Sequence, residues 1–551
     1  MSATIDIEKF QDYFDDAPVL SVSGRLYNVD VKYLDEPCRD YLEEAVDKAV
    51  YIHENNSEGD ILIFLTGEEE IETACNMLRD SIDEYTYGRC NVIPLYSTLP
   101  PGQQQKIFEA RPPTNKSGRP GRKIVVSTNI AETSITIDGI VYVIDSGYSK
   151  QKVYNPRLRM ESLLVSPISQ ASAKQRKGRA GRTREGICYR LYTEETYKEL
   201  EKTTYPEILR SNLSTVILTL LKLGVEDIVH FDYMDPPAPE TVMRALELLH
   251  YMGAIDDKGH LTDDGVIMAH TPLDPELAKV LISSQSTNCT NEILTIVSML
   301  SVPSVFVRPR NQQSTADDAK KKFIHNTGDH LTLLTVYNTF KSRSDSDAFC
   351  RQNFLNIKNL KNADNVRNQL QRMIESNGIN VPKNTFPLDF NESKANKILK
   401  TMLTGCFAQV CHLELAGYYL TVRENQMVLM HPSTVLGYKP SWVLYHDFVC
   451  TGQNYIRTIS KIKPEWLFEL APEFYNVDEF PKGSVKRALI KVKVQASEEE
   501  NGKKEDLSKY GIKDEEENNN LKLKEISHDL IKEKGAYAKY SAIKKYKVNK
   551  D

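Results

Sequence analysis

The sequence lacks the features that would mark it for export or for a membrane. No run of about 18 uncharged apolar residues occurs in it, so we expect no membrane-spanning helix and no membrane partner. The N-terminus has no basic segment followed by an apolar core, and nothing there indicates secretion. The nine cysteines are odd in number and never stand as Cys-x2-Cys pairs. We therefore expect reduced core thiols and no metal site.

The chain also has no overall excess of basic residues, because its net charge is −6. The charge is nevertheless unevenly distributed. Residues 111–190 hold 16 lysines and arginines but only five acidic residues, a local charge of +11. Such an excess indicates a polyanionic partner, either a nucleic-acid backbone or a nucleoside triphosphate. The alternative at this point is a basic face that meets only solvent.

A chain of 551 residues is too long for one core and predicts several domains. Between residues 20 and 190, short apolar runs alternate with segments of helix-forming composition, as in a doubly wound α/β domain with a parallel sheet. Ligands of such domains meet the carboxyl ends of the strands, so we expect functional residues just after each run. The runs are ILIFLTG (61–67), NVIPLY (91–96), KIVVST (123–128) and GIVYVIDSG (139–147).

The rest of the chain changes character several times. Two strand-like stretches flank Asn155-Pro156 and predict a hairpin over about 148–167. Residues 206–275 are helical in pattern and contain a tight turn at Asp257-Lys258-Gly259, as in a winged helix. Helical segments follow, and then a β-rich region from about 400 to 480 that suggests a small barrel. Residues 491–551 carry 15 lysines and 13 acids, which predicts disorder.

The segment QRKGRAGR, from Gln175 to Arg182, is the most informative stretch. Its arginines recur every three residues, and two glycines let the backbone come close to a ligand. The planar guanidinium stays charged and grips phosphate oxygens in two places. Such arginines stabilise the transferring group in phosphoryl transfer. Taken alone, the segment could also be a solvated loop or an RNA-binding patch.

A second segment, STNIAETSITIDGI (127–140), follows a buried run and offers hydroxyl and amide groups at its end. The two segments resemble motifs VI and V of superfamily 2 helicases, and in detail the DEAH-box RNA helicase family. Three further stretches match in order: SAT (2–4) with motif III, FLTGEEEI (64–71) with motif IV, and LYSTLPPGQQQKIFE (95–109) with the family motif that follows. The resemblance covers about residues 1–485.

The resemblance implies an α/β RecA-like lobe, then mostly α-helical winged-helix and ratchet-like domains, a β-barrel OB-fold and a disordered tail. It also implies ATP-driven movement of single-stranded RNA from 3′ to 5′, in spliceosome disassembly and ribosome biogenesis. The implied divisions are a remnant of a first lobe (1–20), the second RecA-like lobe (21–205), the winged helix (206–275), the ratchet-like domain (276–385), the OB-fold (386–485) and the tail (486–551).

The resemblance further implies a role for individual residues of this chain. Arg179 and Arg182 match the arginine fingers, and Gln175 matches the glutamine near the attacking water. Residues matched to ATP contacts are Phe108, Thr136, Asp138 and Arg176. Residues matched to RNA contacts are Thr66, Gly67, Ser97, Thr128 and Asn129. Ser2 and Thr4 match the motif that couples the lobes.

Two positions depart from the family pattern, and two assignments have plain alternatives. Lys177 stands where a small residue is usual, and Ser97 where glycine is common, which puts a close backbone approach at Ser97 in doubt. Phe108 could instead be a core aromatic, and Asp138 could instead serve a turn or a helix cap.

The sequence contains neither a Gly-x-x-x-x-Gly-Lys-[Ser/Thr] phosphate-binding loop nor an Asp-Glu-Ala-His segment. We therefore expect the carboxyl-terminal part of an RNA helicase, whose Mg²⁺ ligands lie in an absent lobe. The alternative is a chain without turnover, acting as an RNA-binding adaptor or as a competitor of the full enzyme. The resemblance implies ATP with Mg²⁺ as cofactor and a nuclear or nucleolar location. It implies single-stranded RNA, glycine-patch activator proteins and spliceosomal or pre-ribosomal particles as partners.

Overall fold

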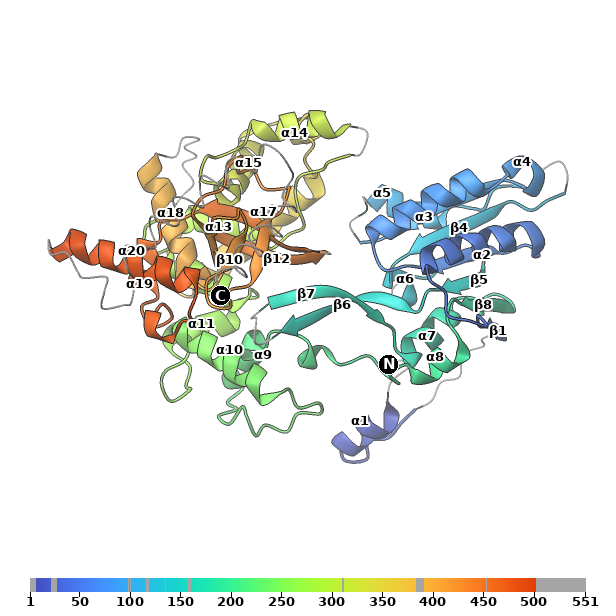
Figure 1. Ribbon diagram of the computed structural model, residues 1–551, viewed down its shortest axis with the longest axis horizontal. Coiled ribbons are helices and arrows are strands. Elements are labelled where there is room, and N and C mark those ends of the chain that lie inside the picture. The colour runs from blue at the N-terminus through green and yellow to red at the C-terminus, as the bar shows by residue number, and fades with distance from the viewer. Residues whose placement is uncertain are drawn as a thin grey trace, which may run out of the picture. The chain divides into compact units, whose positions relative to one another are not determined.

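The computed structural model of the chain describes residues 6–20, 27–97, 99, 101–114, 118–133, 135–155, 160–309, 312–382, 391–451 and 453–501. Two compact units make up the chain (Figure 1). Unit 1 comprises Met1–Val153 and Leu163–Arg210, and unit 2 comprises Tyr154–Ser162 and Ser211–Asp551. The described helices include none that is long and apolar enough to cross a lipid bilayer.

Unit 1 is built on a six-stranded parallel sheet with the strand order β1-β8-β5-β2-β4-β3. The four predicted apolar runs form its four consecutive strands β5, β2, β4 and β3. Strands β2, β4 and β5 are buried at every position, as strands covered on both faces must be. The strands are β1 (Val29–Lys32), β2 (Asp60–Phe64), β3 (Cys90–Leu95), β4 (Arg122–Ser127), β5 (Ile140–Asp145) and β8 (Gly186–Arg190).

Helices cover both faces of this sheet. Ile61 and Ile63 point to one face and pack with Ala49, Ala74 and other residues of α2 and α3. The alternate residues of the same strands point to the other face and pack with residues of η1, α6 and the segment after α7. The helices of unit 1 are α1 (Ile7–Tyr13), α2 (Tyr41–Asn55), α3 (Glu68–Ser81), α4 (Glu84–Tyr87), α5 (Pro101–Gln104), η1 (Gln105–Phe108), α6 (Ile130–Thr133), α7 (Gln170–Lys177), α8 (Glu194–Glu199) and η2 (Glu207–Leu209).

The predicted hairpin is confirmed. Strands β6 (Tyr148–Asn155) and β7 (Met160–Pro167) form a two-stranded sheet of their own that leaves the lobe directly after β5 (Figure 1). The base of the hairpin is closed by the amide of Ile168, which donates to the carbonyl of Gly147 at 2.9 Å.

Unit 2 is helical up to its barrel. The predicted turn in the winged-helix region is present, because Ile255 and Leu261 form an antiparallel bridge and Gly259 between them has a φ of 83°. The helices of unit 2 are α9 (Ser214–Lys222), α10 (Pro239–Tyr251), α11 (Asp263–His270), α12 (Pro275–Ser283), α13 (Thr290–Leu300), α14 (Gln313–Lys321), α15 (Asp329–Ser342), α16 (Ser346–Gln352), α17 (Ile357–Ser376), α18 (Glu392–Cys406), α19 (Glu465–Leu470), η4 (Val477–Glu479) and α20 (Ser484–Asn501).

The predicted barrel is a closed five-stranded one with the order β10-β11-β13-β12-β9. The first turn of helix α15 is hydrogen-bonded to the barrel region. Asp329 accepts from the amides of Val435 and Ile459, and His330 is hydrogen-bonded through Nδ1 to Ser460 Oγ at 2.8 Å. The strands are β9 (Val410–Leu413), β10 (Tyr419–Thr421), β11 (Met427–Met430), β12 (Trp442–Thr451) and β13 (Gln453–Lys461).

His330 should make the stability of unit 2 depend on pH. Burial, and then the charge of His446, lower the pKa of His330 to about 3. An unfolded histidine binds a proton below pH ~6.5, whereas the folded one stays neutral. Acidification from pH 7 to 5 is therefore expected to cost about 2 kcal/mol through this group alone. Urea unfolding at both pH values should show a smaller loss in His330→Gln than in the wild type.

The tail begins later than predicted. The boundary at 486 falls inside α20, and this helix buries five apolar side chains, namely Val485, Leu489, Ile490, Val492 and Val494. Disorder was expected from residue 486, and for 486–501 this was wrong. Residues 502–551 lie outside the described part of the chain.

Candidate nucleotide and nucleic-acid site

Five residues matched to RNA contacts lie at the carboxyl edge of the sheet, as predicted from the ends of the apolar runs. Thr66 and Gly67 follow β2, Ser97 follows β3, and Thr128 and Asn129 follow β4. Main-chain hydrogen bonds from Leu65 to Ser127 (2.9 Å) and from Thr128 to Leu95 (3.2 Å) bring the three segments together. Ser97 and Asn129 are exposed and Thr128 is half-buried, whereas Thr66 and Gly67 are buried.

A lysine that the sequence did not single out lies at this edge. Lys150 on β6 is exposed, and its Nζ would be 2.7 Å from a Cβ at Gly67. The lysine ammonium thus lies directly beside Gly67, and a side chain at 67 would have to displace the flexible end of Lys150. In the sequence Lys150 was only one of the 16 basic residues of the 111–190 segment. Its place beside Gly67 could not be predicted, because it depends on where the hairpin leaves the sheet.

The arginine segment and the segment after α6 meet at a different place. Arg179 donates through Nη1 to the carbonyl of Ile135 at 3.2 Å and through Nη2 to the carbonyl of Glu132. The exposed Arg182 donates through Nη1 to Thr136 Oγ1 at 2.6 Å. The predicted fingers and Thr136 therefore form one cluster, and Gln175 lies half-buried on α7 just before it.

This cluster lies toward the amino edge of the sheet, whereas the sequence pattern had pointed to the carboxyl ends of the strands. The carbonyl of Gly181 accepts from the amide of Tyr27, just before β1. A Cβ at Gly181 would lie 2.6 Å from the carbonyl oxygen of Tyr27. Gly181 is thus needed for packing against the chain, whereas the sequence suggested an approach to a ligand. Asp138 is exposed in the turn before β5.

Phe108 belongs to the same edge. The carbonyls of its neighbours Ile107 and Glu109 accept from Lys123 Nζ, and Lys123 lies at the start of β4. The Phe108 side chain is 64% exposed, so the alternative reading of a core aromatic is wrong. Asp60 links the neighbourhood of Phe108 to the turn of Asp138. Its carboxylate accepts a hydrogen bond from the amide of Lys123, and its own amide donates to the carbonyl of Gly139.

Arg176 is placed differently from its neighbours. It is fully buried, and its Nη1, Nε and Nη2 donate to Asp145 (2.7 Å), Glu132 (3.2 Å) and the carbonyl of Tyr148 (3.1 Å). Burial opposes the charge, but Asp145 and then Glu132 outweigh it and raise the pKa of Arg176. A guanidinium without exposed surface has nothing to offer a phosphate in this conformation. The geometry assigns Arg176 to the interior, in place of the predicted contact with nucleotide.

Arg179 and Arg182 together make a place for an anion. Burial, and then the positive charge of Arg182, lower the pKa of Arg179. Among the described residues Arg182 forms no ion pair with a carboxylate. Two neighbouring guanidiniums, one of them exposed, fit a phosphate group. Ser2 and Thr4 lie outside the described residues.

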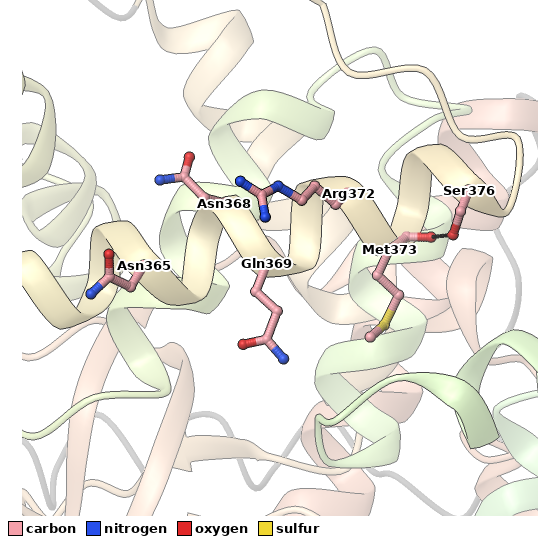
Figure 2. Close-up of a pocket in the computed structure, with 6 residues that line it drawn as sticks. All are labelled: Asn365, Asn368, Gln369, Arg372, Met373 and Ser376. Atoms are coloured by element: carbon pink, nitrogen blue, oxygen red, sulfur yellow. Dashed lines mark hydrogen bonds between the residues drawn. The ribbon is translucent and has the colours of Figure 1, made fainter.

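An open groove along α17 in unit 2 is lined by Asn365, Asn368, Gln369, Arg372, Met373 and Ser376 (Figure 2). These residues share one face of the helix, and Ser376 Oγ donates to the carbonyl of Met373 at 2.7 Å. Arg372 is the one charged residue of its lining. The groove lacks paired cations, so the cluster of Arg179 and Arg182 remains the candidate site.

Four family descriptions match the chain. Residues 41–184 match the helicase conserved C-terminal domain, and 245–273 match the winged-helix part of the helicase-associated domain. Residues 274–333 match its ratchet-like part, and 398–475 match an oligonucleotide/oligosaccharide-binding fold. Together they indicate a DEAH/RHA-type helicase of superfamily 2. These helicases are ATP-dependent hydrolases that act on nucleic acid, and the matched ranges follow the predicted order of domains.

On unit 1, which contains the match to the helicase C-terminal domain, the residues present suit one side of an ATP site. The paired guanidiniums suit the phosphates, and the exposed ring of Phe108 suits a base. The described residues contain no group of three potential metal ligands.

Proposed function

We propose that the chain carries the second RecA-like lobe and the accessory domains of an ATP-dependent helicase that moves along single-stranded RNA from 3′ to 5′. The observation that carries the proposal is the cluster of Arg179 and Arg182 with Thr136 on one edge of the lobe, with an RNA-facing set on the other. One protein can then hold a triphosphate and a nucleic-acid backbone at once.

On this proposal Arg179 and Arg182 bind the γ-phosphate and stabilise the charge that develops during its transfer. Gln175 orients the attacking water, and Thr136 and Asp138 contact the ribose and phosphates. Phe108 stacks on the adenine. Bound Mg²⁺ would neutralise charge on the phosphates, and its ligands would come from a lobe that carries a phosphate-binding loop.

At the carboxyl edge, Ser97, Thr128 and Asn129 offer hydroxyl and amide groups to phosphates and sugars of RNA. Thr66 and Gly67 complete the proposed RNA-contacting set after β2, although both are buried in this conformation, and Lys150 adds a positive charge beside Gly67. Sequence-independent contacts of this kind suit an enzyme that moves along a strand.

Replacing Lys150 with alanine is expected to weaken binding of single-stranded RNA about equally for all sequences. The slope of log K against log salt should fall by about 1, because one phosphate contact is lost. Fluorescence anisotropy with a labelled oligonucleotide over a salt series measures both quantities. Lys48→Ala is the matched control, since Lys48 forms a surface ion pair with Glu44 on α2. An unchanged slope in Lys150→Ala would remove Lys150 from the RNA path.

Replacing Phe108 with alanine is expected to raise the KM for ATP by about tenfold, since stacking of one base contributes about 1–3 kcal/mol. The ring is exposed, so the stability of the lobe should change little. Steady-state hydrolysis in a protein completed with a phosphate-binding lobe gives the value. Tyr51→Ala, at another exposed aromatic, is the control. Equal KM values for the two variants would contradict the assignment.

We propose spliceosome disassembly and ribosome biogenesis as the processes, with glycine-patch activators and spliceosomal or pre-ribosomal particles as partners, in the nucleus or nucleolus. The ordered run of motifs from residue 2 to residue 182 supports this. Co-purification of a glycine-patch protein with the chain from nuclear extract tests it, and association with cytoplasmic RNA–protein particles alone would contradict it.

A second candidate function is RNA binding without turnover, as an adaptor or competitor. It is favoured by a sequence without a phosphate-binding loop or an Asp-Glu-Ala-His segment. RNA-stimulated ATP hydrolysis by the purified chain alone would exclude it.

A further inference from the structure

The side chain of Arg176 holds the base of the β6–β7 hairpin. Its Nη2 donates to the carbonyl of Tyr148, the first residue of β6, and its Nη1 donates to Asp145 at the end of β5. Its guanidinium lies 4.8 Å from the ring centre of Phe64, the last residue of β2. All three contacts are at the carboxyl edge of the sheet, the edge proposed to meet RNA.

The same side chain reaches the arginine cluster by a second arm. Nε of Arg176 donates to the carboxylate of Glu132, and the main-chain carbonyl of Glu132 accepts from Arg179. Glu132 is therefore shared by a buried arginine and by one of the proposed fingers. Because the guanidinium is planar and rigid, the two arms cannot move independently.

The hairpin base is also tied to the segment after β2. The ring of Tyr148 stacks on Tyr41, with ring centres 5.2 Å apart. The hydroxyl of Tyr41 donates to one oxygen of Glu70 at 2.7 Å, and the other oxygen accepts from the amide of Thr66 at 3.1 Å. A displacement of Tyr148 would therefore shift Tyr41 and Glu70, and with them the amide of Thr66, as well as the hairpin.

We infer that Arg176 is a positioning residue that couples the loop of Arg179 and Arg182 to the base of the β6–β7 hairpin. The naming of the two ends as nucleotide and RNA sites rests on the proposed function, but the mechanical link does not. When a ligand draws Arg179 away, the Glu132 carbonyl moves, its carboxylate shifts, and Arg176 transmits the shift to Tyr148. The coupling runs through contacts within one lobe.

Hydrogen exchange followed by mass spectrometry on the 551-residue chain tests the link without ATP or RNA. In Arg176→Lys, which keeps the charge and loses the fork, exchange should accelerate about tenfold in two places at once. These are residues 148–153 with 163–167 of the hairpin, and residues 178–184 of the arginine loop. Peptides from β2 and β4 should be unchanged.

Arg122→Lys is the matched control. Arg122 is also buried, but it donates to the carbonyls of Gly59, Asn56 and Ser57 ahead of β2. Its replacement should loosen residues 56–60 and leave the hairpin and the loop of Arg179 as they are. Acceleration in only one of the two places in Arg176→Lys would overturn the inference.

A double-mutant cycle separates coupling from a merely structural role. Arg179→Ala should accelerate exchange in the hairpin when residue 176 is arginine, and should have no further effect in the Arg176→Lys background. Equal effects in both backgrounds would overturn the inference. If Arg176→Lys does not fold, Glu132→Gln takes its place, since it weakens the carboxylate arm and keeps the carbonyl that Arg179 uses. Neither of these two overturning results would affect the proposal that Arg179 and Arg182 bind ATP, because that proposal is tested separately by ATP hydrolysis.

Discussion

Replacing Arg182 with alanine is expected to lower RNA-stimulated ATP hydrolysis by about 10³-fold or more, in a protein that joins the chain to a lobe with a phosphate-binding loop. The guanidinium is exposed on its loop and donates a hydrogen bond to Thr136 Oγ1, an exchangeable hydroxyl partner, so it is available to the γ-phosphate. Affinity for single-stranded RNA should be retained, because the residues proposed to contact RNA lie at the other edge of the sheet. Coupled-enzyme assays of hydrolysis and anisotropy measurements of RNA binding give the two values.

Arg184→Ala is the control for this prediction. Arg184 lies two residues further along, is half-exposed, and forms an ion pair with Glu58 at 3.3 Å. Its loss should change hydrolysis less than about tenfold, because the residue is held away from the cluster by that pair. A turnover rate of Arg182→Ala close to that of Arg184→Ala would show that the finger is misassigned.

Replacing Arg176 with methionine is expected to lower the free energy of unfolding of unit 1 by about 3–5 kcal/mol. Methionine fills much of the same space, but the change leaves the carboxylates of Asp145 and Glu132 without their cation. Asp145 is fully buried and would keep a hydrogen bond from Tyr192 at 3.0 Å. Denaturant unfolding followed by circular dichroism measures the loss.

Two further variants set the range within which the loss of stability in Arg176→Met should fall. Arg184→Met breaks a half-exposed ion pair and should cost about 0–1 kcal/mol. Adding Asp145→Asn and Glu132→Gln to Arg176→Met should restore part of the stability, since the unpaired charges are then gone. A loss in Arg176→Met no greater than in Arg184→Met would contradict a buried ion-pair network.

The parts of the fold that could be predicted from the sequence are those set by local pattern. The continuous apolar runs predicted strands β2 to β5 of a sheet that is covered on both faces. The turn around Gly259 predicted the hairpin of the winged-helix region. The short outer strand β1 (Val29–Lys32) alternates buried and exposed residues and was not singled out. The average composition of residues 491–551 concealed the buried positions of α20, since its lysines lie between Leu489, Val492 and Val494.

The candidate site was predictable in its residue types but only partly in its geometry. Three arginines spaced three residues apart look equivalent, and only the fold shows which one turns inward. Arg176 is buried because Asp145, 31 residues earlier, ends a central strand beneath it. The separation of the two proposed edges was likewise hidden, because α6 follows the carboxyl end of β4 whereas Asp138 lies before the amino end of β5.

The most direct test of the account is to mix or join the chain with a lobe that carries the phosphate-binding loop and the Asp-Glu-Ala-His segment, and to measure ATP hydrolysis with and without single-stranded RNA. The account predicts RNA-stimulated hydrolysis that appears only when both parts are present and that disappears in Arg182→Ala. Hydrolysis by the added lobe that is unchanged by this chain, or that survives in Arg182→Ala, would contradict it.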